Sequence, residues 1–102
     1  MIMKKIEIKG EIIPNDDQEM YDWFGIDAVS PKKVLSELGV AGGDDIEIEI
    51  NSIGGDVVSA SEISTAIRSY AGNKQINVVG LAASAASVIA MSAKSSIAPT
   101  AL

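Results

Sequence analysis

The sequence contains no cysteine and no histidine among its 102 residues. Without cysteine these residues can form no disulfide, no thiolate nucleophile and no cysteine-ligated metal site, and this favours a cytoplasmic location. Without histidine they supply neither an imidazole metal ligand nor an imidazole general base. We therefore expect no metal and no cofactor here.

Aromatic residues and positive charges are also scarce. One Trp, one Phe and two Tyr are present, so Ile, Val, Leu and Ala must build the core. The formal net charge is −6, which argues against a nucleic-acid surface and against a polybasic membrane patch. In the longest uncharged stretch, residues 75–93, ten of the 19 residues are Gly, Ala or Ser, and no signal peptide is visible. We expect neither nucleic acid nor membrane as a partner.

Apolar and polar residues alternate in three segments, which predicts strands. The predicted strands are residues 6–13, with Gly10 as a bulge, residues 45–51, and residues 75–81, with Ile76, Val78 and Val79 in the core. A further strand-like segment starts at Ser95 and runs to Leu102.

Helical spacing predicts three helices. The first begins at Ser30-Pro31, buries Val34, Leu35 and Leu38, and ends at Gly39. The second spans residues 57–70 behind an Asp56 cap, and the third, residues 84–93, is apolar almost all round and should be buried. Residues 18–29 lack a period and are predicted to be a loop. The alternation of strands and helices indicates an α/β fold with a mainly parallel sheet.

Two segments differ from ordinary scaffold. In Asn51-Ser52-Ile53-Gly54-Gly55-Asp56, adjacent glycines allow a sharp turn before a helix, where backbone N–H groups can face an anion. In Gly80-Leu81-Ala82-Ala83-Ser84-Ala85-Ala86-Ser87, a strand ends and Ser84 opens a helix. A serine there can have an accessible hydroxyl, a helix dipole beneath it and a free N–H beside it, which are what an acyl-transfer nucleophile needs. Taken singly, the first is also an ordinary turn, and the second is also an N-cap or a small-residue packing face.

The pair of motifs, with a helix and a strand between them, resembles the proteolytic subunit of Clp proteases. The longer run from Gly80 to Met91 is most similar to the phage head-maturation branch of that family. The resemblance implies a Clp/crotonase-like fold, a repeated β-β-α superhelix with a mainly parallel sheet. It covers residues 46–102, with weaker support from the first strand.

The resemblance also implies a serine endopeptidase. Ser84 would attack the peptide carbonyl, and the backbone N–H groups of Gly55 and Ala85 would form the oxyanion hole. Residues Gly54, Gly55 and Asp56 would bind the polypeptide substrate as an added strand. The implied assembly is a homo-oligomeric ring, with an ATPase unfoldase or capsid proteins as further partners.

The sequence departs from the cellular Clp pattern at three positions. Ile53 replaces a usual Pro, Ala85 a usual Met and Ala86 a usual Gly, and the last two fit the phage branch. The histidine and aspartate that complete the family's triad follow the nucleophile, and the sequence reaches Leu102 without a match to either. We interpret residues 1–102 as the N-terminal portion of a single, truncated Clp-protease-like domain, inactive by itself.

Three alternatives remain at this point. A crotonase-like acyl-CoA hydratase or isomerase also uses backbone N–H groups after a glycine-rich turn, but needs no serine at position 84. A non-enzymatic assembly module would use Ser84 only as a helix cap. A relative of the membrane-bound signal-peptide peptidases is the third, although no membrane anchor is visible.

Overall fold

The computed structural model describes residues 3–93 and 95–97. Its strands are β1 (Lys4–Ile12), β2 (Ala28–Val29), β3 (Ile46–Gly55), β4 (Lys74–Ala82) and β5 (Ser95–Ile97). Its helices are the 3₁₀ turn η1 (Asn15–Asp17) and the α-helices α1 (Gln18–Trp23), α2 (Pro31–Ala41), α3 (Val57–Ser69) and α4 (Ala85–Ala90).

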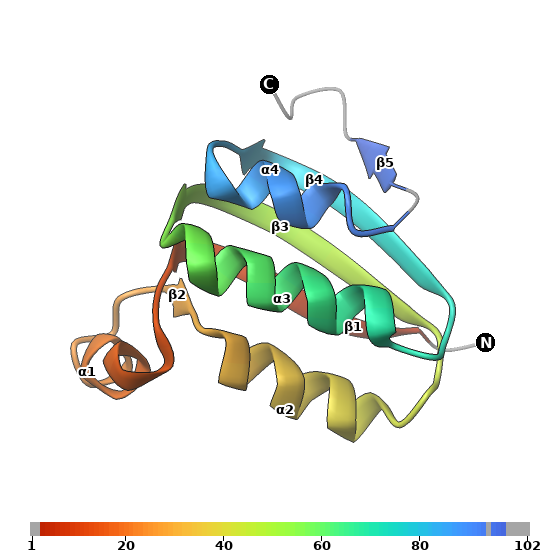
Figure 1. Cartoon of the computed structure of the whole chain (residues 1–102), viewed down its shortest axis with the longest axis horizontal. Helices are drawn as coiled ribbons and strands as arrows, with labels where there is room; N and C mark the ends of the chain where they lie inside the picture. The colour runs from red at the N-terminus through yellow and green to blue at the C-terminus, as the bar shows by residue number, and fades with distance from the viewer. Residues whose placement is uncertain (1–2, 94, 98–102) are drawn as a thin grey trace.

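The strands form one sheet in the order β2-β1-β3-β4-β5, and every neighbouring pair is parallel. From β1 onwards the strand order follows the chain order, and crossovers between parallel strands keep one hand. The connecting helices α2, α3 and α4 therefore all lie on the same face of the sheet (Figure 1). The α/β fold with a parallel sheet expected from the sequence is confirmed.

Isoleucine dominates the core between that face and the helices. The fully buried isoleucines on the strands β1, β3 and β4 are Ile6, Ile8, Ile12, Ile46, Ile48, Ile50 and Ile76. Those on the helices are Ile63, Ile67 and Ile89. Burying one such side chain contributes about 1.5–3 kcal/mol before the loss of conformational entropy is counted. The core is thus made of the aliphatic residues that the scarcity of aromatics required.

The opposite face of the sheet carries no helix among the described residues. Lys5 and Glu49, on β1 and β3, form an ion pair there with an Nζ–Oε2 distance of 3.4 Å. Parallel sheets are usually covered on both faces, and their strands then read as continuous apolar runs. The polar face explains why these strands alternate so regularly in the sequence.

Several predicted boundaries were wrong. Residues 18–29, predicted to be a loop, contain α1 and β2. The helix expected to end at Gly39 continues to Ala41, where Gly42 adopts a left-handed conformation (φ 61°) and ends it. Leu35, expected on the buried face with Val34 and Leu38, is exposed.

The end of β3 and the region after β4 also differ from expectation. The segment 52–55 is not a turn but the last part of β3. Val79 faces the open side of the sheet and is 45% exposed. The last helix is shorter than residues 84–93, and Val88 and Met91 are exposed instead of buried. Residues 95–97 form β5, and the rest of the predicted strand up to Leu102 lies outside the described residues.

Candidate active site

The carboxyl end of β3 is held in place by Ser52. This buried side chain donates a hydrogen bond to the carbonyl oxygen of Gly10 on β1 (2.5 Å) and accepts one from the N–H of Gly54 (3.0 Å). The register between β1 and β3 shifts between Lys9 and Glu11, so Gly10 lies in the predicted bulge. One hydroxyl therefore links the bulge to the glycine pair.

Glycine is required at both positions of that pair. Gly54 and Gly55 have φ values of 98° and 148°, a region that favours glycine. A Cβ atom on Gly55 would lie 2.2 Å from the carbonyl oxygen of Ile12 in β1. A Cβ atom on Gly54 would lie 3.0 Å from the Cβ atom of Ser84 and 3.1 Å from the backbone nitrogen of Ala85. The two sequence motifs therefore meet at Gly54 and Ser84.

Ser84 has an unusual backbone conformation. With φ 53° and ψ −125°, it is the one non-glycine residue with positive φ in the described part of the chain. Such conformations cost about 1–3 kcal/mol and concentrate at functional sites. Ser84 occupies the N-cap position of α4, yet its side chain makes no capping hydrogen bond, and the residue is exposed. Capping therefore does not account for this serine.

The strained turn is fixed by its neighbours. The N–H of Ala83 donates to the carbonyl oxygen of Ser52 (3.1 Å), which extends the contact between β3 and β4. The hydroxyl of Ser87 donates to the carbonyl oxygen of Ser84 (2.6 Å). Gly80 lies beside Asn51 of the first motif, since a Cβ atom on Gly80 would be 2.5 Å from the Oδ1 atom of Asn51.

Ala85 and Asp56 lie at the starts of the two helices beside the candidate site, Ala85 as the first residue of α4 and Asp56 as the N-cap of α3. Ala85 is the first residue of α4, and a backbone N–H at that position has no acceptor within its own helix. Asp56 caps α3, because its Oδ2 atom accepts hydrogen bonds from the backbone N–H (2.8 Å) and the hydroxyl (2.6 Å) of Ser59. The hydrogen bond from the Ser59 hydroxyl, and after it the bond from the Ser59 backbone N–H, hold the pKa of Asp56 below its usual value.

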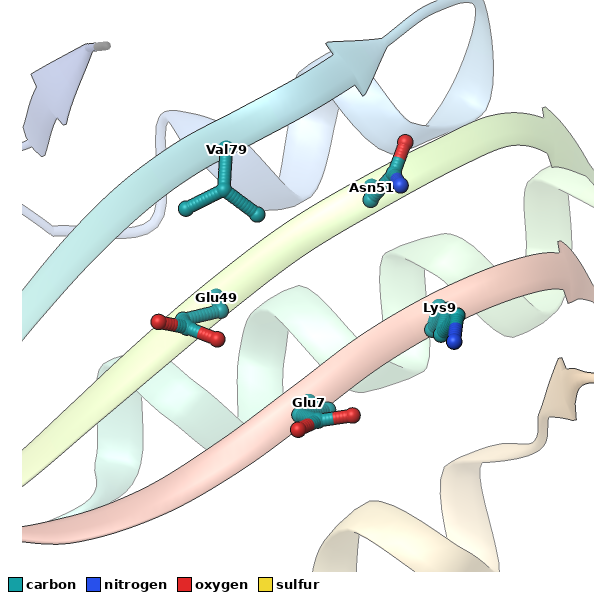
Figure 2. A pocket seen from close by; sticks show the side chains of 5 residues that line it. All are labelled: Glu7, Lys9, Glu49, Asn51 and Val79. Atoms are coloured by element: carbon teal, nitrogen blue, oxygen red, sulfur yellow. The ribbon is translucent and has the colours of Figure 1, made fainter.

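A separate hollow of about 210 Å³ lies on the open face of the sheet. Figure 2 shows its lining side chains, which come from three neighbouring strands: Glu7, Lys9, Glu49, Asn51 and Val79. Asn51 belongs to the first motif, but Ser84 does not line this hollow. It therefore lacks the candidate serine, and we do not assign the candidate active site to it.

The family model described as Clp protease matches residues 26–101. The chain belongs to the Clp protease family. Members of this family are serine peptidases. The match includes both motifs and the strained serine between β4 and α4. At the level of the family, it favours the protease over the acyl-CoA enzyme considered above.

Solved structures of Clp proteases have a similar fold. ClpP1 from Listeria monocytogenes is 28% identical, with a TM-score of 0.63, and the match covers 88% of this chain and 46% of that one. Its N165D mutant is 27% identical, with a TM-score of 0.64 over 89% of this chain and 47% of that one. The chain thus matches the N-terminal half of the ClpP fold and spans about half the length of these proteins. No curated protein matches it.

The sequence predicted which residues form the candidate site but not the contacts between them. The structure brings together Gly54 and Ser84, and Asp56 caps a helix as predicted. The roles of Ser52 and Asn51 were missed, although both stand in the quoted motif. A serine two residues before a glycine pair was the available signal, because its short hydroxyl can bond backbone groups that an irregular strand leaves unpaired.

Within residues 3–93 and 95–97, none of the helices has the length and apolar character needed to cross a membrane. The same residues contain no group of three or more acidic side chains arranged to hold a metal ion.

Proposed function

We propose that this chain carries the nucleophile and the oxyanion hole of a Clp-type serine endopeptidase, with Ser84 as the nucleophile. The observation that carries the proposal is the strained, exposed Ser84, which caps no helix and lies against Gly54. A serine on a sharp strand-to-helix turn presents its hydroxyl to a substrate in the same way as a nucleophile elbow.

The backbone N–H groups of Gly55 and Ala85 are the proposed oxyanion hole. The N–H of Asp56 donates to Ile12 in β1 (2.9 Å). Gly55 directly follows Gly54, which lies against the Cβ atom of Ser84 and the nitrogen of Ala85, so the N–H of Gly55 is the proposed donor from the end of β3. Ala85 supplies the second donor from the first position of α4. Losing one such donor typically lowers turnover about 10²–10³-fold.

Residues Gly54 to Asp56 are the proposed binding strand for the polypeptide substrate, and of the three Gly55 is exposed. An extended peptide would add to it by main-chain hydrogen bonds, with its scissile carbonyl beside Ser84. The general base of the proposed triad is a histidine from outside these 102 residues, because they include none.

We place the protein in the phage head-maturation branch, since Ala85 and Ala86 replace residues of the cellular pattern. Assembly into a homo-oligomeric ring, a cytoplasmic location, and an ATPase unfoldase or capsid proteins as partners belong to the same proposal. They follow from the family resemblance and not from a contact in this chain.

A fluorophosphonate probe tests the nucleophile in the natural protein that contains this chain. Wild-type protein should be labelled, and Ser84→Ala should lose the label completely. Ser61→Ala, which removes an exposed serine on α3, is the matched control and should be labelled at the wild-type rate. Labelling of Ser84→Ala at the wild-type rate would show that another residue is the nucleophile.

A further inference from the structure

Four large apolar side chains on α1 and just after it are exposed to solvent. Met20, Trp23, Phe24 and Ile26 are 54%, 84%, 67% and 54% exposed. They include the one Trp and the one Phe of the sequence. Aromatic residues are normally among the most valuable contributors to a core, so exposing both indicates a contact surface. We call these four residues the α1 patch.

The α1 patch rests on a fixed support. The side chain of Gln18 donates to the carbonyl oxygen of Ala28 (3.1 Å) and accepts from the N–H of Ser30 (2.8 Å). The hydroxyl of Tyr21 donates to the Oε1 atom of Glu11 on β1 (3.0 Å). The polar side chains of α1 thus attach the helix to the sheet and leave its apolar side chains available to a partner. Because the helix is already held in place, little conformational entropy would be lost when a partner binds.

The patch continues toward the candidate active site. Figure 1 shows α1 beyond the end of the sheet to which the strands point, where β3 leads into α3. A hollow of about 260 Å³ includes Asp56, Val58 and Asp16. A second, of about 340 Å³, includes Asp16, Met20 and Trp23. Asp16 lines both, so the surface leads from the proposed substrate strand to the α1 patch.

The charge of this surface defines its partner. Every charged residue that lines either hollow is acidic: Asp16, Glu19, Asp56 and Glu62. A second copy of this chain, with a net charge of −6, would meet repulsion here. A segment with positive charges would be attracted, and would also bind faster at low salt.

We propose that the α1 patch and its two hollows bind an extended polypeptide segment that carries a large apolar side chain next to Lys or Arg. This inference rests on the proposed function, because it identifies the segment as the part of the substrate that extends beyond the strand at Gly54–Asp56. The apolar side chain packs on Trp23 and Phe24, and the basic side chain faces Asp16 and Glu19.

Binding is measured with the natural protein carrying Ser84→Ala, so that the probe is not cleaved. The probes are fluorescein-labelled octapeptides observed by fluorescence anisotropy: Gly-Ser-Lys-Leu-Leu-Lys-Gly-Ser and three analogues, with Gln or Glu for Lys, or Ser for Leu. Trp23→Ser, Phe24→Ser and the double variant Asp16→Asn/Glu19→Gln are compared with Val40→Ser. Val40 is a matched control, since it is 72% exposed on α2 and lines neither hollow.

The basic, leucine-containing peptide should bind at least roughly tenfold more tightly than each analogue. Trp23→Ser and Phe24→Ser should weaken it by a similar factor, the acidic double variant should abolish its preference for Lys over Gln, and Val40→Ser should change nothing. Equal binding of the four peptides, or wild-type binding by Trp23→Ser, overturns the proposal. So does light scattering that shows a dimer dissociated by Trp23→Ser, because the patch then binds a second copy. Labelling of wild-type Ser84 is measured in parallel, so a failure of the protease proposal is seen separately from a failure of docking.

Discussion

At the scale of single residues, the site is defined by backbone conformation more than by reactive groups. Gly54, Gly55 and Ser84 all have positive φ. Gly54 lies against Ser84, and Gly55 lies against Ile12 of β1. Only the serine has a side chain in this set, and its conformation is the costly one. The packing of two motifs distant in sequence compensates for that strain. A change to the backbone here should therefore affect stability and chemistry together.

Gly54→Ala should destabilise the protein by about 1–3 kcal/mol. The alanine would have to adopt the φ of 98° that Gly54 has, and its Cβ atom would lie 2.8 Å from the carbonyl oxygen of Ala83. The substitution should also abolish fluorophosphonate labelling of Ser84. Urea denaturation of the natural protein measures the first effect. Gly39→Ala is the control, since Gly39 lies inside α2 with open space around its Cβ position. That change should raise stability by about 0.5–1 kcal/mol. A Gly54→Ala protein that is as stable and as reactive as wild type would contradict this account.

At the scale of secondary-structure elements, the sequence specified the type of most elements but not their ends. The alternation of β1, β3 and β4 was visible because one sheet face is polar, and caps such as Ser30 and Asp56 marked the helix starts. The helix α1 was missed because its apolar residues face solvent, so no periodic burial pattern exists to detect. Gly39 was mistaken for a helix end because propensity alone does not distinguish it from Gly42, where the chain turns left-handed.

The candidate site was likewise predictable in its residue types but not in its contacts. The types of residue at Ser84 and at the glycine pair suggested their chemistry, and the family resemblance joined them. The contacts of Ser52 with Gly10 and of Asn51 with Gly80 depend on the register between strands. Gly10 marked the bulge in β1, but the sequence did not show which residues of β3 and β4 would lie opposite each other.

The cap of α3 should make stability depend on pH. Because the hydrogen bonds from Ser59 lower the pKa of Asp56 in the folded state, the stabilisation they give is complete above the pKa of the unfolded chain. It is lost as the pH falls through the lower, folded pKa, which places the change below about pH 4. Asp56→Asn keeps an acceptor at the cap but cannot ionise. The difference in urea midpoint between wild type and Asp56→Asn should be largest at neutral pH and shrink below pH 4; a difference that is constant with pH would exclude this linkage.

At the scale of the whole molecule, charge and exposed apolar surface are combined differently around α1 and around α4. The α1 patch is bordered by acidic residues, which suits a basic peptide. The helix α4 contains no charged residue, and Val88 and Met91 on and after it are 36% and 68% exposed. Two copies of an acidic chain can approach each other at α4 without the repulsion that they would meet at α1.

We therefore expect the contacts between copies in the proposed ring to include α4. Burial of Met91 and Val88 between copies would remove apolar surface from water, whereas a carboxylate placed there would have to be desolvated without a partner. Met91→Glu and the double variant Val88→Glu/Met91→Glu should lower the mass measured by light scattering to that of a smaller species at the same protein concentration. Val40→Glu adds the same charge at a similarly exposed position on α2 and should leave the mass unchanged. Circular dichroism confirms that each variant is folded. An assembly of wild-type mass in both α4 variants would exclude this helix from the contacts between copies.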